Sequence, residues 1–520
     1  MLAAGAAGLA SACSSGSGSP PAPTPGTPAS PGSATAAGHA RRSGVDWSRL
    51  ARHVEGTLAR PGDPAYDTVR LVENPRYDAA RPLAVLSVAS APDVATALAF
   101  AQDHDLPVAL RSGGHSYPGW SAGDGGGVPR SLVLDLRPMS GVSLSSAALP
   151  TQQVATIGAG AALAPVYDSL GRRGRAIAGG SCATVGIAGL TLGGGVGVLT
   201  RAMGLTCDAV TSMQVVTADR RVRRVSADQD PDLFWALRGG GGGHLGVVTS
   251  FQLATSPAPT ISTVYLQWPL SAAAQVLPVW QEWAPRTDAR LWSTLKALGG
   301  ARHPDGPVLV LAGTWTGPAS GFDAALSWLV DHTPAPVVRS TQLRSYREVM
   351  LSYAGCLAVP IARCHTGPGG ALEREPFSGT SHVAYDALTA PGISEVVDRV
   401  ASVPAGLLEA GVSLDALGGR VRDVEPAATA FVHRNALATV QYTATYPSGP
   451  VGPSASKADA YVRGFRRAMT PHWGDHAYVN YADPTLPHPG TAYFGANLPR
   501  LRSVARAYDP DGFFAQPQGY

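Results

Sequence analysis

The chain has 520 residues, 45% of them hydrophobic, and a formal net charge of +3 at pH 7. A chain of this length is too long to fold around one small hydrophobic core, so we expect two domains with appendages. The small, dispersed positive charge excludes electrostatic binding of nucleic acid, and no apolar run approaches the roughly 20 residues of a membrane span. The sequence has two lysines, Lys296 and Lys457. Neither lies in a glycine-rich loop, which argues against a P-loop and against Schiff-base chemistry.

The first 44 residues differ in composition from the rest of the chain. Residues 1–12 are small and apolar, and Ala10-Ser11-Ala12-Cys13 is similar to a bacterial lipoprotein cleavage box, so Cys13 is a candidate lipid anchor. No basic segment precedes the box, and we expect that the start codon is assigned too late. Residues 14–44 are mainly Pro, Ser, Gly, Ala and Thr, which predicts a disordered linker. We therefore expect a secreted or lipid-anchored protein on the outer face of a bacterial membrane; a disordered tail with a chance cysteine is the alternative.

Residues 45–257 mix strands and helices. Ser90 as N-cap and Pro92 in the first turn indicate a helix that continues through Ala101. Further helices are predicted at 163–170 and 232–237. Strands are predicted at 83–88, 106–110, 132–136, 154–157 and 247–253, and within a β-rich stretch at 210–225. Because these elements do not follow a strict βαβ alternation, the pattern indicates an α+β fold.

The character of the sequence changes at a proline-rich segment, residues 256–259, which is typical of a domain border. Beyond it lie amphipathic helices, predicted at 273–283 and 322–330, a strand at 308–313, and a strand pair that brackets 419–446. This pattern predicts an antiparallel sheet with helices on one face. We divide the chain into a leader and linker, a first domain, a second domain and a C-terminal segment, at residues 1–44, 45–257, 258–465 and 466–520.

Two glycine-flanked loops carry the candidate chemistry. Arg111-Ser112-Gly113-Gly114-His115-Ser116 contains an imidazole, and Gly180-Ser181-Cys182-Ala183-Thr184-Val185-Gly186 presents a thiol. Glycine lets the backbone approach a ligand closely. Taken alone, a loop histidine is usually structural and a cysteine among small residues is usually buried and inert. Together, two nucleophiles on such loops are what a covalently tethered flavin requires.

A third glycine cluster, at residues 239–246, satisfies the G-x-G-x-x-G spacing of dinucleotide-binding loops. A Rossmann loop follows a strand and opens a helix, whereas this cluster follows a predicted helix and opens a predicted strand. No acidic residue occurs between Val247 and Gln281 to bind a ribose hydroxyl. We therefore exclude a Rossmann site and expect a ligand-contacting loop.

These motifs resemble the berberine bridge enzyme-like family of the vanillyl-alcohol oxidase superfamily. The resemblance covers most of the chain after residue 75, through segments at 233–238, 429–434, 478–483, 493–497 and 500–518. It implies a PCMH-type FAD-binding domain at 45–257 and a substrate-binding domain at 258–465. It also implies that the segment 466–520 returns to the FAD domain.

The resemblance further implies a covalently bound FAD, with His115 bonded to the flavin 8α-methyl group and Cys182 to C6. Leu190 stands where many bicovalent members carry histidine, so one tether and two tethers both remain open. The other residues expected to contact the cofactor are Arg111, Ser112, Gly113, Gly114, Ser116, Gly180, Val185, Gly186, Gly189, Gly193, Gly194, Gly246, Val248 and Asn480. We expect no metal site.

Tyr481 is the candidate base, because the family motif places this phenol beside the substrate carbon. A phenol has a pKa of about 10, so Tyr481 would need a nearby cation or donor, for which His433 and Arg434 are candidates. Plant alkaloid-forming members use a glutamate in the strand after this pair. Here residues 439–441 contain no carboxylate, which favours simple alcohol oxidation.

Three other side chains have candidate roles. Tyr117 and Trp120 follow the His115 loop and would either stack on a substrate or serve ordinary packing. Val185 matches the position where a small side chain gives dioxygen access to the flavin, which implies O2 as acceptor and H2O2 as product.

In an exported protein Cys356 and Cys364 could form a disulfide, although spacing alone does not establish it.

The leading hypothesis is an FAD-dependent oxidase that transfers hydride from an alcohol or hemiacetal carbon of a saccharide or secondary metabolite. Oxidative cyclisation of a secondary metabolite on the same flavin is the second enzymatic reading. A tethered extracellular lipoprotein that binds a ligand is the alternative of another class, but it leaves His115, Cys182 and Tyr481 without a purpose.

Overall fold

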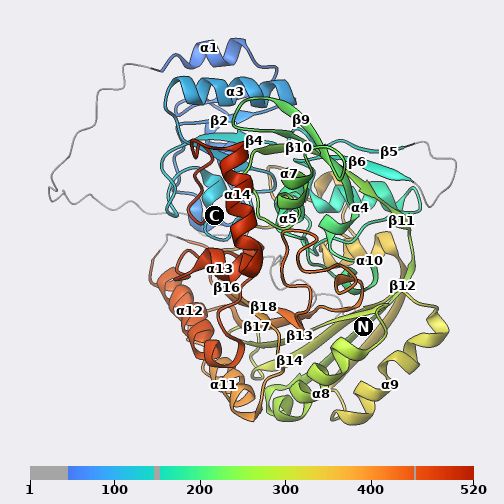
Figure 1. Ribbon diagram of the computed structural model, residues 1–520. Helices are drawn as coiled ribbons and strands as arrows, with labels where there is room; N and C mark the ends of the chain where they lie inside the picture. Colours follow the sequence, from blue (N-terminus) through green and yellow to red (C-terminus); the bar gives the residue numbers. More distant parts are fainter. Residues whose placement is uncertain (1–44, 146–152, 450–451) are drawn as a thin grey trace.

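The computed structural model describes residues 45–145, 153–449 and 452–520. The candidate anchor Cys13 and the linker lie outside these residues. Within the described chain, two groups of sheets are stacked on each other (Figure 1). The three described segments include no helix with the length and hydropathy needed to cross a bilayer.

The first group begins with a four-stranded sheet in the order β1-β2-β4-β3. Its strands β2, β4 and β3 are parallel, and β1 is antiparallel to β2. The helix α3 (Ala91–Asp103) starts as predicted, with the Ser90 hydroxyl accepting from the Asp93 backbone N–H. The strands are β1 (Thr57–Ala59), β2 (Ala84–Ser87), β3 (Val108–Arg111) and β4 (Leu132–Asp135). The helix α1 (Trp47–Arg52) precedes β1, and α2 (Tyr66–Val69) follows it.

A five-stranded antiparallel sheet in the order β5-β6-β10-β8-β9 adjoins it. The strands are β5 (Val142–Leu144), β6 (Val154–Gly158), β8 (Val210–Val216), β9 (Val222–Ser226) and β10 (Val247–Ala254). Its helices are α4 (Leu163–Gly171), α5 (Ile187–Leu192), α6 (Thr200–Met203) and α7 (Pro231–Ala236). A short pair, β7 (Arg175–Ala176) with β11 (Ser256–Pro257), leads to the second group. The strands and helices predicted for this region are confirmed.

The second group is a seven-stranded sheet in the order β15-β12-β14-β13-β17-β18-β16. Every pairing in it is antiparallel, as the sequence predicts. The strands are β12 (Thr260–Pro269), β13 (Leu291–Gly299), β14 (Val308–Trp315), β15 (Val338–Ser345), β16 (Phe377–Ala384), β17 (Glu409–Ala416) and β18 (Ala438–Thr445). The helix α10 (Tyr346–Tyr353) follows β15 and contacts α4 of the first group.

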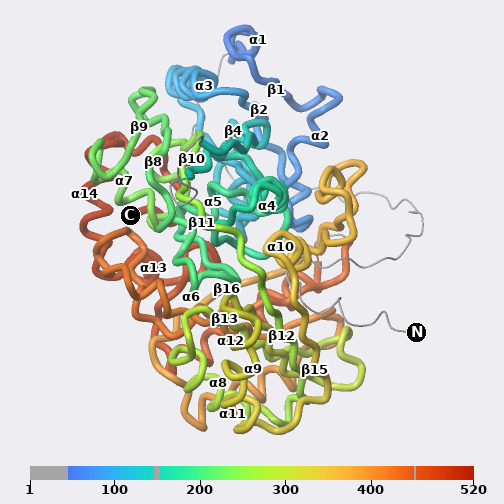
Figure 2. Tube along the Cα trace, turned by 90° about the vertical axis from the view of Figure 1, so that its right-hand side faces the viewer, coloured from blue at the N-terminus to red at the C-terminus, as the bar shows by residue number. Residues whose placement is uncertain are grey.

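Four helices cover the outer face of this sheet: α8 (Ala273–Arg286), α9 (Phe322–His332), α11 (Ala390–Ala401) and α12 (Pro453–Trp473). Both views place α8, α9 and α11 at the end of the molecule farthest from α1 (Figures 1 and 2). Alternate strand residues, such as Leu295, Leu311 and Leu414, pack against these helices in one buried cluster. Because side chains alternate across a strand, the intervening residues point to the opposite face, toward the first group.

The C-terminal helices α13 (Pro489–Phe494) and α14 (Leu498–Tyr508) lie beside the first group (Figure 1). The Arg500 guanidinium is 2.7 Å from the Asp232 carboxylate on α7, and the Tyr508 hydroxyl donates to Asp230 at 2.9 Å. The division of the chain at residues 44, 257 and 465 remains a prediction; α12 itself continues past 465 to Trp473.

A buried arginine fixes the two groups against each other. The Arg201 guanidinium, on α6, donates to the carbonyl oxygens of Leu291, Leu417 and Thr287 at 2.8, 2.6 and 2.7 Å. Since Leu291 begins β13 and Leu417 follows β17, these bonds hold the inner face of the seven-stranded sheet opposite the loops of the first group. The site lies in the space between them.

Candidate functional site

A cavity of about 360 Å³ lies between the loops of the first group and the inner face of the seven-stranded sheet. The His115 loop, the Cys182 loop, the glycine segment 242–248 and the C-terminal segment 479–482 form one side. Alternate residues of four strands form the other side: Trp292, Thr294, Lys296, Val310, Ala312, Ser413, Asp415 and Gln441. The two predicted loops therefore meet at one site, although about 70 residues separate His115 from Cys182 in the sequence.

The two loops cross at contact distance, and the crossing requires glycine. A Cβ atom on Gly113 would lie 2.2 Å from the Gly186 backbone nitrogen, and one on Gly186 would lie 2.0 Å from the Ser112 hydroxyl oxygen. Any larger side chain would push the loops apart. The Ser112 hydroxyl donates to the Ala159 carbonyl at 2.6 Å, which ties the crossing to the end of β6.

His115 is held by the neighbouring loop. Its Nε2 atom lies 2.8 Å from the Thr184 hydroxyl and 3.8 Å from the Glu73 carboxylate. Burial lowers the pKa of His115 below its usual value, with Glu73 opposing the shift. The imidazole is therefore neutral at pH 7, which leaves one ring nitrogen with a lone pair and makes His115 a competent nucleophile.

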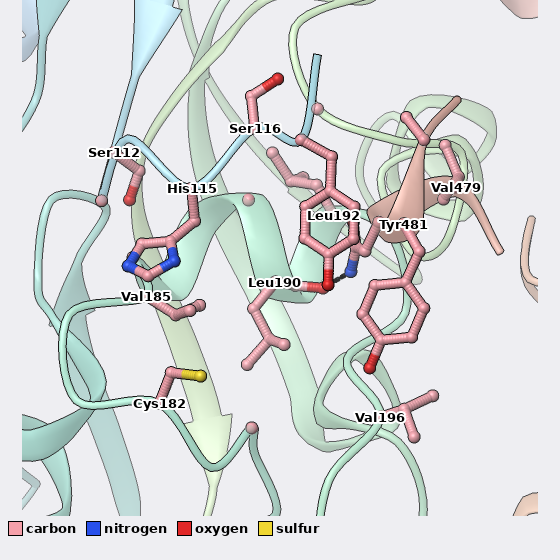
Figure 3. A pocket seen from close by; sticks show the side chains of 18 of the residues that line it. Ser112, His115, Ser116, Cys182, Val185, Leu190, Leu192, Val196, Val479 and Tyr481 are labelled. Carbon is pink, nitrogen blue, oxygen red and sulfur yellow. Dashed lines mark hydrogen bonds between the residues drawn. The ribbon is translucent and has the colours of Figure 1, made fainter. Parts of the chain in front are cut away.

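Cys182 lies on the same side of the cavity as His115, with Val185 between them and Leu190 nearby (Figure 3). The Cys182 thiol is half-buried and is not part of a disulfide, whereas Cys356 and Cys364 are disulfide-bonded with their Cα atoms 5.8 Å apart. The pairing that spacing alone could not establish is thus present. Cys207 is buried, and burial raises the pKa of its thiol, which disfavours the nucleophilic thiolate.

The C-terminal segment locks onto the helix that follows the Cys182 loop. The Asn480 side-chain amide donates to the Leu190 carbonyl at 3.0 Å and to the Tyr478 hydroxyl at 2.9 Å. A Cβ atom on Gly193 would lie 2.0 Å from the Asn480 Oδ1 atom, and one on Gly194 would lie 2.7 Å from the Phe431 ring. Gly193 and Gly194, expected at the cofactor, thus lie behind the cavity wall. Their lack of a side chain leaves room for Asn480 and Phe431 to pack against the backbone.

Tyr481 enters the cavity from the same segment (Figure 3). Its ring stacks on Tyr117 with centroids 5.4 Å apart and meets Tyr478 edge-on at 5.0 Å. Burial raises the pKa of Tyr481 well above its usual value, and the Asp415 carboxylate adds to the shift. The phenol is therefore protonated at neutral pH, so it is not a phenolate base by itself.

The expected cations are engaged elsewhere. The Arg434 guanidinium is fully buried and contacts both Asp208 carboxylate oxygens at 2.7 and 2.8 Å. His433 pairs with the Tyr385 hydroxyl at 2.9 Å, and burial lowers the pKa of His433 to about 3. Neither residue lines the cavity. The expectation that they assist Tyr481 is wrong, because Arg434 is paired with Asp208 and His433 with Tyr385, both outside the cavity.

Sequence reasoning missed the carboxylate of the site. Asp415, on β17, lies directly opposite Thr439 of β18 in the sheet register, so the carboxylate is supplied by the strand next to residues 439–441. Burial raises the pKa of the Asp415 carboxyl, and the Thr294 hydroxyl and the Lys296 ammonium oppose that shift. An aspartate inside the apolar run 412–416 is a sequence signal that could have found it.

The remaining predicted residues take the following places. Tyr117 lines the cavity and accepts a hydrogen bond from the Gln441 amide, and Trp120 lines the cavity while donating to the Gly126 carbonyl at 2.9 Å. Arg111 is fully buried; it donates to the Ser121 and Val69 carbonyls, and burial lowers its pKa to about 10. The other expected cofactor contacts that line the cavity are Gly114, Ser116, Gly180, Gly189, Gly246 and Val248.

Comparison with known proteins identifies the family. A family model described as an FAD binding domain matches residues 82–226, and one described as berberine and berberine like matches residues 477–519. The FAD-linked oxidoreductase YgaK of Bacillus subtilis is 30% identical over 468 residues, which cover 88% of this chain and 95% of YgaK. The chain belongs to the berberine bridge enzyme-like family of FAD-linked oxidoreductases.

Other relatives agree with this assignment. The xylooligosaccharide oxidase of Thermothelomyces thermophilus is 29% identical over 505 residues, covering 93% of this chain and 96% of the relative. The solved carbohydrate oxidase from Microdochium nivale is 26% identical with a TM-score of 0.79, covering 92% and 99%. The predicted α+β class with a PCMH-type FAD-binding fold and an FAD cofactor is confirmed.

The residues of the cavity fit FAD. Within the described chain, the backbone N–H groups of Gly114, His115 and Ser116 have no protein acceptor, so they are open to an anionic group such as a pyrophosphate. A Cβ atom on Gly189 would meet no atom within 4 Å, so the backbone there borders open space. Apolar side chains, including Val185 and Leu190, supply a wall for an aromatic ring.

Replacing Gly113 by alanine tests the loop crossing. The added Cβ would lie 2.2 Å from the Gly186 nitrogen, so the loops must separate at a cost of about 1–3 kcal/mol in the free energy of unfolding. We expect the purified Gly113→Ala protein to carry little FAD, as measured by its flavin-to-protein absorbance ratio. Gly141→Ala is the control, since its Cβ would meet nothing within 4 Å. Equal flavin content in both variants would contradict the crossing.

Proposed function

We propose that this enzyme removes hydride from an alcohol or hemiacetal carbon of a small molecule, a saccharide or a secondary metabolite, and passes it to covalently bound FAD. The observation that carries the proposal is the meeting of His115, Cys182, Tyr481 and Asp415 at one cavity. The names of the relatives, a xylooligosaccharide oxidase and a carbohydrate oxidase among them, support a saccharide.

We assign His115 and Cys182 as the two tethers of FAD. A solved glucooligosaccharide oxidase from Acremonium strictum, 26% identical with a TM-score of 0.78, is described as carrying 6-S-cysteinyl, 8α-N1-histidyl FAD. The placement of both nucleophiles on one side of the cavity supports the same arrangement here. When bound, FAD supplies the hydride acceptor. The remaining cavity-lining loop residues, among them Ser112, Gly180, Gly186 and Val248, would hold it.

Tyr481 and Asp415 provide the route for the substrate proton. As the substrate hydroxyl gives its proton to the Tyr481 oxygen, the phenol can give its own proton to Asp415, so no free phenolate is needed. The raised pKa of Asp415 makes this carboxylate a better proton acceptor than an exposed aspartate. The Lys296 ammonium opposes that rise in the pKa and so favours the ionised carboxylate. Tyr117 and Gln441, joined by their hydrogen bond, would position the substrate against Tyr481, with Trp120 at the cavity wall.

We assign dioxygen as the final electron acceptor and H2O2 as its product. Support comes from Val185, whose small side chain lines the cavity between His115 and Cys182 (Figure 3). Oxidative cyclisation would use the same hydride transfer, but no specific feature of the cavity favours it. Because the chain belongs to an oxidoreductase family, an enzyme is favoured over the alternative of a ligand-binding lipoprotein.

Counting the tethers tests the cofactor assignment. We expect acid-precipitated protein to stay yellow, and single variants His115→Ala and Cys182→Ala each to keep one covalent bond, because each tether is independent. Mass spectrometry of peptides containing residues 115 and 182 would show both modifications in the parent. An unmodified Cys182 in the parent would reduce the assignment to one bond, and a colourless pellet would refute covalent attachment.

Substitutions in the proton route should lower turnover without loss of FAD. We expect Tyr481→Phe and Asp415→Asn each to reduce kcat by about 100-fold or more, because a positioned base contributes this much. The measurement is peroxide release in a saccharide screen, with the flavin spectrum as the check on cofactor content. Tyr265→Phe, a half-buried phenol on β12 outside the cavity, is the control.

The pH dependence of kcat for the same reaction tests whether the ionised Asp415 carboxylate is the form needed for turnover. Activity should fall as pH falls through the raised pKa of Asp415, because the protonated carboxyl accepts no proton. Lys296→Met removes a charge that lowers this pKa, so the acid limb of kcat should move to higher pH. A limb that stays in place, or moves to lower pH, would refute Asp415 as the acceptor.

We also propose that the protein is exported and lipidated at Cys13. The cleavage box at residues 10–13 supports this, as does the Cys356–Cys364 disulfide, a bond typical of oxidising compartments. We expect the mature N-terminus to be Cys13 carrying lipid, as measured by mass spectrometry of membrane-extracted protein. A cytosolic protein with an intact Met1 would refute the proposal.

A further inference from the structure

Glu73 reaches the His115 loop through both its side chain and its backbone. This residue lies just before the short 3-10 helix Pro75–Tyr77. Its carboxylate Oε2 is 3.8 Å from the His115 Nε2, and its backbone N–H donates to the Gly114 carbonyl at 3.2 Å. The Glu73 side chain is 15% exposed and that of His115 is 18% exposed, so the pair is shielded from bulk water.

A segment that leads into β16 anchors Glu73 in this place. The Thr366 hydroxyl donates to the Glu73 Oε2 at 3.0 Å. The Arg374 guanidinium donates to the carbonyl oxygens of Val72 and Glu73 at 2.9 and 3.3 Å. The carboxylate is therefore held at a fixed position relative to the imidazole by a segment more than 290 residues away in the sequence.

The start of this segment also packs against the Cys182 loop. Cys364 is bonded to Cys356, and both pack in one buried cluster with Ala183, the neighbour of Cys182. The segment 356–374 thus contacts Glu73, whose backbone N–H binds the His115 loop, and also Ala183 in the Cys182 loop. It is placed to align the two nucleophiles with each other.

The contacts of His115 distinguish its two ring nitrogens. Nε2 faces the Thr184 hydroxyl and the Glu73 carboxylate, whereas Nδ1 has no hydrogen-bond partner among the described residues. An acceptor that holds one ring nitrogen as N–H leaves the lone pair on the other. Glu73 and Thr184 therefore direct the lone pair to Nδ1.

We propose that Glu73 is a positioning residue for covalent attachment of FAD, acting through His115; this rests on the tether assignment above. The Nδ1 lone pair forms a bond to the 8α carbon of FAD, and one C–H bond of that methyl group breaks, its proton leaving to solvent and its electron pair passing to the flavin ring. The Nε2 proton passes to Glu73, 3.8 Å away, while the Thr184 hydroxyl lies 2.8 Å from the same nitrogen. Dioxygen takes the two electrons released and, with the two protons, becomes H2O2.

Single-tether protein isolates this step. In a Cys182→Ala background all covalent FAD is bonded through His115, and intact mass after addition of FAD measures its rate of attachment. We expect Glu73→Ala to slow attachment about tenfold or more, and Glu73→Gln to slow it similarly, because neither accepts a proton. Thr366→Val, which frees the carboxylate, should give a smaller loss. Glu282→Gln is the control, since its side chain is 55% exposed on α8 and pairs with Arg286.

Small carboxylates separate a chemical role from a structural one. Formate should restore attachment in Glu73→Ala, whereas chloride at equal concentration should not, because only formate can accept the proton. Attachment at the parent rate in Glu73→Ala and Glu73→Gln would overturn the proposal. Slow attachment with no rescue and weakened non-covalent FAD binding would also overturn it, by assigning Glu73 to packing alone. A Cys182→Ala parent that acquires no covalent FAD would refute the His115 tether itself.

Discussion

The close crossing of the His115 and Cys182 loops is the constraint on which the rest of the site depends. Gly113 and Gly186 touch through their backbones, and neither position has room for a Cβ atom. Because the crossing is made by backbone rather than by flexible side chains, it sets the separation of the two nucleophiles rigidly. The segment 356–374 and Glu73 then act on a geometry that is already defined.

The second sheet contributes chemistry through the alternation of its strands. Leucines on one face of the sheet pack against the helices α8, α9 and α11. Asp415, Lys296 and Gln441, on the other face, line the cavity. Arg201 holds that inner face against the loops by three bonds to backbone carbonyls. The proposed proton acceptor and the loops proposed to bind the flavin thus come from different sheets, and the interface between them assembles the site.

Burial sets the protonation states at this interface. It keeps His115 neutral, keeps Tyr481 protonated, and raises the pKa of Asp415 above its usual value. Each shift follows from the cost of placing a charge in a poorly hydrated space. One physical cause thereby acts on both the proposed nucleophile for cofactor attachment and the proposed proton relay.

The sequence by itself determined the local elements, the two nucleophile loops and the family, because apolar periodicity, helix caps and glycine spacing are local signals. It also made Tyr481 a candidate, but it left the Cys356–Cys364 pairing open until the structure showed the bond. Only the tertiary structure decided which groups surround Tyr481: His433 and Arg434 are bound elsewhere, and Asp415 takes the place expected of a carboxylate near Thr439. Strand register and the packing of distant segments join residues such as Glu73 and Thr366, and no local pattern encodes that pairing.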